Sequence, residues 1–176
     1  MRWAHLLAGC LLLLTLAGCS SPGVVTHAGP IATGFPVSTD FIVVETSSSL
    51  EDAQVEQQSL NELVLSGLRQ TGFFGSVTGN RTEINSGSGM EVRIDLREIK
   101  RVSPNDRTWF GGLAGNAGVT VQVTVSDFKS GRSIQAFEIK AASGASAQAG
   151  TTDAALELAA RDIVAEIGTI RSKTSD

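Results

Sequence analysis

Four charged residues alternate with apolar ones along residues 90–97, and they could serve as general acids or bases. They are Glu91, Arg93, Asp95 and Arg97. Paired carboxylates cleave glycosidic bonds, and in inverting enzymes they lie roughly 6.5–9.5 Å apart. Residues four apart on one strand face are separated by about 13 Å, so Glu91 and Asp95 are too distant. Arg93 between them favours the ionised form of both. We interpret the set as a solvated strand face and expect no catalytic residue.

The remaining chemically capable residues are few. The sequence has two histidines and two cysteines and no tyrosine. Only His27 lies beyond the first twenty residues, so a Ser-His-Asp or Cys-His arrangement is excluded from the folded region. Zinc and iron sites built on His or Cys are excluded for the same reason. We therefore expect a protein that is not an enzyme and needs no metal and no cofactor.

Residues 107–118 are better suited to binding than to catalysis. They combine an arginine and two large aromatic residues, which dominate interface energies, with glycines that permit close backbone approach. The segment lacks Gly-x-Gly-x-x-Gly and precedes a strand, so we exclude nucleotide binding. In an alternative interpretation, Trp109 and Phe110 close one end of the core. The candidate contact surface is Arg107, Trp109, Phe110, Gly111 and Gly112.

The first 18 residues have the organisation of a secretory signal peptide. A basic start, Met1-Arg2-Trp3, precedes the eleven-residue apolar run Leu6–Leu16. This run is too short to span a membrane, which takes about 20 apolar residues. A small-residue stretch then provides a cleavage site. We expect residues 1–18 to be removed.

Leu16-Ala17-Gly18-Cys19 resembles the lipobox of bacterial lipoproteins. The resemblance implies cleavage before Cys19 and acylation of its sulfur, and several acyl chains on one cysteine anchor a protein firmly. A similar string ends at Cys10, but cleavage there would leave too short an apolar segment. Ser20 and Ser21 follow with no Asp, a pattern similar to that of lipoproteins exported to the outer membrane. We expect a lipid anchor at the periplasmic face of that membrane.

Composition limits the partners of the processed chain. Without residues 1–18 it carries 13 Lys and Arg against 18 Asp and Glu, a net charge of −5. An acidic chain without a basic block argues against nucleic acid. Its size predicts a single domain, which we place at residues 40–170. Residues 19–39 have loop composition and predict a flexible tether reaching at most about 70 Å. We expect a disordered tail at residues 171–176.

Hydrophobic periodicity predicts the elements of this domain. A β-rich run at 41–45 is followed by a helix with a capping-box pattern at Ser48 and Glu51, which ends at Gly72. The remaining segments predict four strands and a second helix. The strands are expected at 74–78, at 90–97 with a bulge at 98–99, at 119–125, and at 132–142 after a turn at Ser130-Gly131, and the helix at 152–169 is capped by Thr152. The order β-α-β-β-β-β-α predicts an α+β fold: a single antiparallel-dominated sheet of about five strands with two helices packed on one face.

The Arg/Trp/Gly-rich segment 107–115, the valine strand, the Gly131 hairpin and the small-residue stretch 141–146 together resemble a bacterial lipoprotein family, domain of unknown function 4410. The element order is more distantly similar to the periplasmic α/β domain of the TolB N-terminus and of curli-secretion lipoproteins. The resemblance implies a binding module rather than an enzyme.

We therefore expect a non-catalytic protein–protein interaction or assembly component of the cell envelope, either with an envelope partner or by self-association. The alternative is a small-ligand or glycan-binding periplasmic module whose pocket is lined by residues 107–118. Aromatic side chains on a convex surface favour the first function, and aromatic side chains in a concave pocket favour the second.

Overall fold

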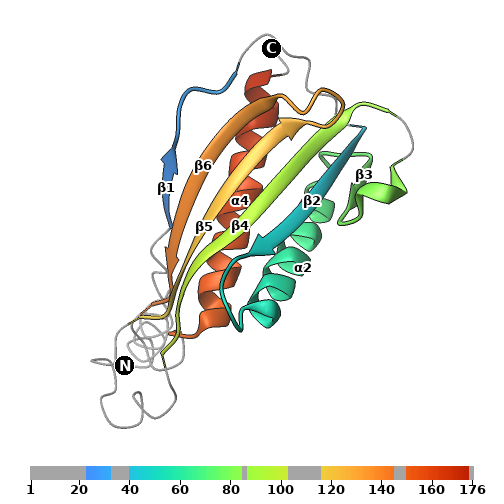
Figure 1. Cartoon of the computed structure of the whole chain (residues 1–176). Coiled ribbons are helices and arrows are strands. Elements are labelled where there is room, and N and C mark those ends of the chain that lie inside the picture. The colour runs from blue at the N-terminus through green and yellow to red at the C-terminus, as the bar shows by residue number, and fades with distance from the viewer. Residues whose placement is uncertain (1–22, 33–39, 85–86, 103–115, 145–149, 175–176) are drawn as a thin grey trace, which may run out of the picture.

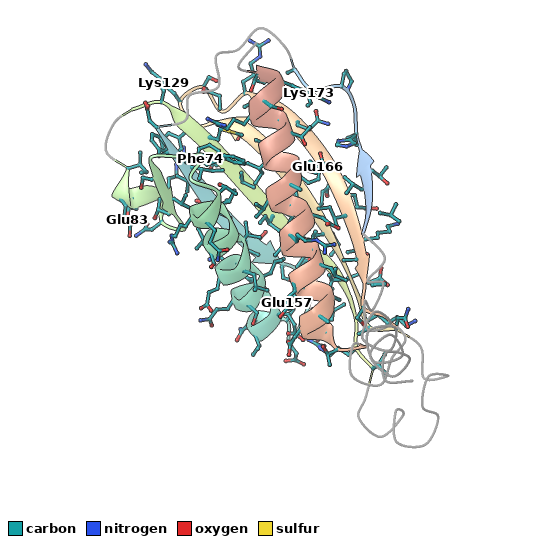
Figure 2. All side chains as sticks on the ribbon, turned by 180° about the vertical axis from the view of Figure 1, so that it is seen from behind. Phe74, Glu83, Lys129, Glu157, Glu166 and Lys173 are labelled. Carbon is teal, nitrogen blue, oxygen red and sulfur yellow. The ribbon has the colours of Figure 1, made fainter. Side chains whose placement is uncertain are left out.

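A computed structural model describes residues 23–32, 40–84, 87–102, 116–144 and 150–174. These residues form one six-stranded sheet with two helices on one face (Figure 1). Figure 2 views the same chain from behind, with the helices in front of the sheet. The strands are β1 (Val24–His27), β2 (Phe41–Ser48), β3 (Ser76–Thr78), β4 (Gly89–Lys100), β5 (Gly118–Asp127) and β6 (Ser133–Ala142). The helices are α2 (Gln54–Thr71) and α4 (Thr152–Thr174), with a 3₁₀ turn η1 (Arg81–Glu83).

The sheet is mixed, with strand order β1-β6-β5-β4-β2-β3. β2 runs parallel to both β3 and β4, and the other three neighbouring pairs are antiparallel. Helix α2 connects the parallel strands β2 and β3, as a crossover between parallel strands requires. The predicted α+β fold, with two helices on one face, is confirmed in outline. The predicted count of about five strands omitted β1.

Strand β1 corrects the prediction that residues 19–39 form a tether. Val24–His27 pairs antiparallel with residues 137–140 of β6. The main-chain N–H groups of Ala28 and Ala32 continue this pairing, donating to the carbonyls of Ala136 and Ile134, both at 2.9 Å. The segment is short and mostly exposed, so its sequence carries no alternation. The open edge of β6 supplies the hydrogen bonds that order it.

The core lies between the sheet and the two helices. Every second residue of β4 and β5 points toward the helices and is buried, as the predicted alternation requires. Helix α2 contributes Leu60, Val64 and Leu68, and α4 contributes Leu156, Ile163 and Ile167. Burying a side chain of this size stabilises the fold by about 1.5–3 kcal/mol. We call the covered side of the sheet the helix face and the opposite side the open face.

The two ends of α2 differ in how well the sequence predicted them. Gly72 ends the helix in the left-handed conformation with φ 64°, as expected of a C-terminal glycine. The predicted capping box at the start is wrong, because α2 begins at Gln54 after Ala53 and has no side-chain cap. Ser48 is instead the last residue of β2, and its hydroxyl donates to the carbonyl of Leu96.

Helix α4 differs from its prediction at both ends. Its start is capped by Thr151 rather than Thr152, because the Thr151 hydroxyl oxygen accepts from the N–H of Ala154 at 3.1 Å. The helix extends to Thr174, so residues 171–174 are helical where we expected a disordered tail. Ile170 is fully buried and anchors this last part of the helix.

The predicted irregularities in the strands are confirmed. The register between β4 and β5 shifts between Leu96 and Glu98, at the predicted bulge. Gly131 has φ 68° in the turn between β5 and β6, a conformation that favours glycine. The side chain of Asp127 supports this turn by accepting from the N–H of Ser130 at 2.7 Å.

Candidate functional site

The residues that we predicted to function, Cys19 and the surface at Arg107 and 109–112, lie outside the described residues. The structure does show where their segments leave the domain. Lys100, which precedes the 107–118 segment, pairs with Gly118, and Gly118 pairs with Ala142. Val24 pairs with Lys140 at the same end of the sheet. The N-terminal segment and the β4–β5 connection therefore start from one end of the sheet, which we call the basal end (Figure 1).

Two polar contacts hold the basal end together. The main-chain N–H and the hydroxyl of Ser143 both donate to the carbonyl of Ala117, at 2.9 and 3.1 Å, and both residues are buried. Arg101 donates to the carboxylate of Glu56 at 2.7 Å and to the carbonyl of Asp52 at 2.8 Å. The hydrogen bond from Arg101 holds the pKa of Glu56 below its ordinary value, although burial acts in the opposite direction. The start of the β4–β5 connection is thereby hydrogen-bonded to α2 and to the residues before it, and its end is hydrogen-bonded to the residue that follows β6.

The N-terminal segment is fixed to α4 immediately before β1. The N–H of Gly23 donates to the Asp162 carboxylate at 2.9 Å. A Cβ at position 23 would lie 2.5 Å from that oxygen, so a larger residue there would displace the carboxylate. Further along, His27 Nε2 lies 3.6 Å from the carboxylate of Glu166, and Gln135 Nε2 lies 3.2 Å from His27 Nδ1. These contacts secure β1 to both α4 and β6.

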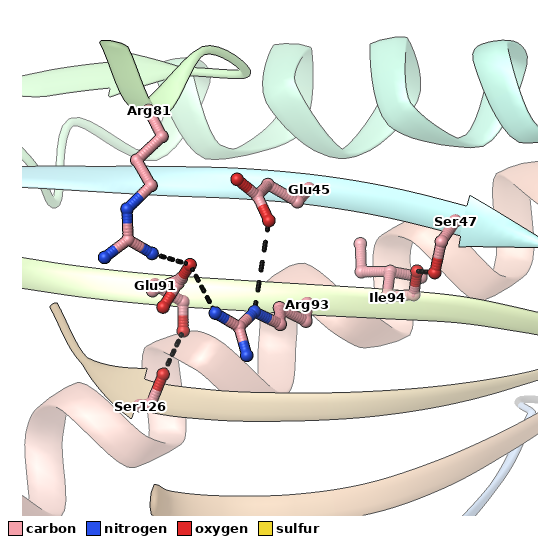
Figure 3. A network of polar contacts seen from close by, with 7 residues as sticks. All are labelled: Glu45, Ser47, Arg81, Glu91, Arg93, Ile94 and Ser126. Carbon is pink, nitrogen blue, oxygen red and sulfur yellow. Dashed lines mark hydrogen bonds and ion pairs between the residues drawn. The ribbon is translucent and has the colours of Figure 1, made fainter. Parts of the chain in front are cut away.

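Most of the charged set on β4 is solvated, as predicted. Arg93 and Arg97 are exposed on the open face, and Arg97 pairs with Asp95 at 2.9 Å. Glu91 is the exception, because only 1% of its surface is exposed. Its carboxylate accepts from Arg81 at 2.5 Å and from Arg93 at 3.0 Å (Figure 3). Glu91 and Asp95 therefore each have an arginine as their ion-pair partner.

Turn η1 and the end of β5 cover Glu91. The guanidinium of Arg81 lies over the ring of Phe128, 4.7 Å from its centre, and this ring meets Phe41 edge-on at 4.9 Å. The side chain of Asn80 fixes the turn by accepting from the N–H of Thr82 at 3.0 Å. The alternation along β4 could not predict that Glu91 is covered. The sequence does contain one signal for it, because Asn80 favours a turn and Arg81 follows it, ten residues before Glu91.

A hollow of about 370 Å³ lies between the edge of β2 and the start of α2. Its lining includes four carboxamide side chains, Gln54, Gln57, Gln58 and Asn61. Two of these amides are already engaged by the strand. Gln57 Nε2 donates to the carbonyl of Thr46 at 2.7 Å, and the Thr46 hydroxyl donates to Asn61 Oδ1 at 3.0 Å. Sequence reasoning missed this hollow, although the amides recur at helical spacing.

In the part of the chain that the structure describes, no group of three or more His, Cys, Asp or Glu residues could hold a metal ion. Among those same residues, no helix combines the length and the apolar character needed to cross a membrane.

Comparison with known proteins shows which fold the chain has. No family model matches it, and no curated protein matches, so the resemblance to domain of unknown function 4410 is not confirmed. Among solved structures it is similar to the PelC dodecamer from Paraburkholderia phytofirmans, with TM-score 0.54 and 14% identity over 88% of this chain and 99% of that one. It is also similar to protein XCC0632 from Xanthomonas campestris, described under DUF330, with TM-score 0.51 and 14% identity over 76% and 90%. At these identities the likeness concerns the fold alone.

Proposed function

We propose that this chain is a lipid-anchored, non-catalytic component of the bacterial cell envelope that acts through protein–protein contacts, including contacts between its own copies. The observation that carries the proposal is the attachment of β1. If Cys19 is acylated, only residues 20–23 separate the anchor from Val24, and they span at most about 18 Å. The domain is then held at the membrane surface.

This short link also orients the domain. The basal end, where Gly23 contacts Asp162, lies nearest the anchor. The β4–β5 connection leaves from the same end, since Lys100 and Gly118 are paired there. The predicted contact surface at Arg107, Trp109 and Phe110 belongs to that connection, whose two ends at Lys100 and Gly118 this proposal places on the membrane-proximal side. We assign the membrane as the outer membrane, from the serines that follow Cys19.

Two observations support contact rather than chemistry. The Glu91 and Asp95 carboxylates are each engaged in an ion pair with an arginine of the same face, so neither is left without an ion-pair partner. PelC, whose fold this chain shares, is a dodecamer. Because the two chains share only 14% identity, self-association is proposed for this chain and does not follow from the fold.

The small-ligand alternative is less well supported by the described residues. The hollow beside β2 has the polar lining that a glycan would need, but Gln57 and Asn61 already bond to Thr46. A ligand there would have to replace these bonds, and replacing a satisfied hydrogen bond yields little net affinity. The pocket that we predicted at residues 107–118 lies outside the described residues.

The anchor is tested with Cys19→Ser, using Cys10→Ser as the matched control. We expect the Cys19 variant to accumulate as an unprocessed, unacylated precursor and to be lost from the outer-membrane fraction. The Cys10 variant should keep the mass and the fraction of the wild type. Wild-type mass and fractionation for Cys19→Ser would refute the lipid anchor.

A further inference from the structure

Among the described residues, the sheet has an open strand edge at each side. On one side, β1 pairs only with β6, so its outer edge is open within the described residues. On the other side, β3 pairs with residues 41–43 of β2 and extends no further. Within the part of the chain that the structure describes, residues 44–48 of β2 therefore form a second open edge, and the hollow described above lies beside it. Open edges offer main-chain hydrogen-bonding groups to an additional strand.

These two edges lie at the same level of the sheet. Following the registers across the strands, His27 aligns through Phe137, Val123 and Ile94 with Thr46. By the same route, Val25 aligns with Ser48. β6 and β4 are both antiparallel to β5, so they run in the same direction. Since β1 is antiparallel to β6 and β2 is parallel to β4, β1 and β2 run in opposite directions.

The composition of both edges favours association. Natural edge strands are often guarded by charged side chains, lysine above all, or by proline. Val24–His27 and residues 44–48 contain neither lysine nor proline, and the one acidic residue among them, Glu45, lies 3.9 Å from Arg93 of β4. Among the described residues, the large hydrophobic side chains left exposed are Val24, at 63%, and Val55, at 75%. Val24 belongs to the β1 edge, and Val55 lies in the first turn of α2, next to Gln54 in the lining of the hollow.

We propose that β1 of one copy pairs antiparallel with residues 44–48 of β2 in the next copy, so that the sheet continues from subunit to subunit. This inference rests on the proposed self-association. The Thr46 carbonyl accepts from Gln57 Nε2, and its second lone pair can accept a main-chain N–H of the incoming strand. The contact joins two different surfaces, so it is heterologous and repeats into a closed ring or a filament.

Paired cysteines test this arrangement in the full-length, membrane-extracted protein. Thr26→Cys is combined with either Glu45→Cys or Ser47→Cys, because all three side chains lie on the open face and two registers are possible. Within one subunit, β1 and β2 are four strand spacings apart, about 19 Å, and a disulfide requires Cα atoms within about 7 Å. Any disulfide between these positions must therefore join two copies.

Mild oxidation should convert one of these double variants into a ladder of covalent multimers on a non-reducing gel. The wild type, each single variant and the control pair Thr26→Cys with Gln122→Cys should not form the ladder. Gln122 is exposed on the same face but lies on the central strand β5. A ladder from the control pair as strong as that from the edge pairs would overturn the edge assignment.

Sedimentation of the uncrosslinked wild type distinguishes a failure of self-association from a failure of edge-strand pairing. An oligomer whose edge pairs fail to crosslink would overturn strand pairing and leave self-association standing. A monomer at all concentrations would overturn both. Val24→Asp and Val55→Asp should each weaken assembly by about tenfold, because each removes a valine-sized apolar contact from the interface. Ser133→Asp, on an exposed residue away from both edges, should leave assembly unchanged.

Discussion

The main-chain N–H of Gly23 donates to the carboxylate of Asp162 at 2.9 Å, across 139 residues of sequence. This contact fixes the point at which the N-terminal segment enters the domain. Only three residues, 20–22, separate this point from Cys19, where we expected a tether of about twenty residues. If Cys19 carries the proposed anchor, the distance between the domain and the membrane depends on how firmly β1 is held.

Asp162→Ala should loosen β1 without unfolding the domain. The hydrogen bond has a charged acceptor, and such bonds contribute about 1.5–3 kcal/mol. Hydrogen exchange at residues 24–28 should accelerate by roughly tenfold or more, while exchange in β4 and β5 stays unchanged. Glu157→Ala, at an exposed position on the same helix, is the control. Equal protection of β1 in both variants would show that Asp162 does not secure the strand.

Glu91→Ala should destabilise the domain more than Asp95→Ala. Glu91 is buried between Arg81 and Arg93, and its loss removes the partner that holds η1 on the open face. Both arginines can still reach water, so we expect a cost of about 1–3 kcal/mol rather than the larger cost of a fully buried orphan charge. Asp95 is paired at the surface and its loss should cost less than about 1 kcal/mol. Urea unfolding of both variants gives the comparison, and equal midpoints would contradict it.

Stability should depend on pH through Glu56. Arg101 lowers the pKa of this carboxyl in the folded protein below its ordinary value of 4.5. Because the pKa is lower in the folded protein than in the unfolded one, ionised Glu56 stabilises the fold fully above the ordinary pKa. This stabilisation is lost as the pH falls through the pKa of the folded protein. Glu56→Gln should therefore be less stable than the wild type at neutral pH, with the difference closing in acid. Thermal unfolding at several pH values measures this, and a constant difference would contradict the assignment.

Trp109→Ala tests the contact surface predicted from the sequence. If Trp109 is at an interface, its loss should weaken association by about 2 kcal/mol or more with little effect on folding. If it closes the core instead, the same change should lower stability by about 3–5 kcal/mol. Unfolding curves and sedimentation on one sample distinguish the two. Strong destabilisation with normal association of the folded fraction would remove Trp109 from the proposed surface.

The parts of the fold with a strong periodic signal could be predicted from sequence. The alternation at Val119–Val125 and the glycine at 131 gave β5 and its turn, because side-chain direction in a strand follows a period of two. Strand β1 could not be predicted, since its order comes from the edge of β6, more than a hundred residues away. The helix start at Gln54 was missed for a related reason: Ser48, whose type suits a cap, is used to bond β4.

The candidate site was less predictable than the fold. The charged strand face was assigned correctly except at Glu91, where a turn ten residues earlier excludes solvent. The hollow beside β2 was missed because it depends on where β3 ends, and local sequence does not determine the length of a neighbouring strand. Both features arise from the packing of segments onto an existing sheet.

We propose that the chain is an acylated, self-associating envelope protein. Native mass spectrometry of the full-length protein, extracted from membranes in detergent, tests acylation and self-association in one measurement. We expect an oligomer whose subunit mass corresponds to residues 19–176 plus acyl chains. A monomer, or a subunit without acyl mass, would contradict it.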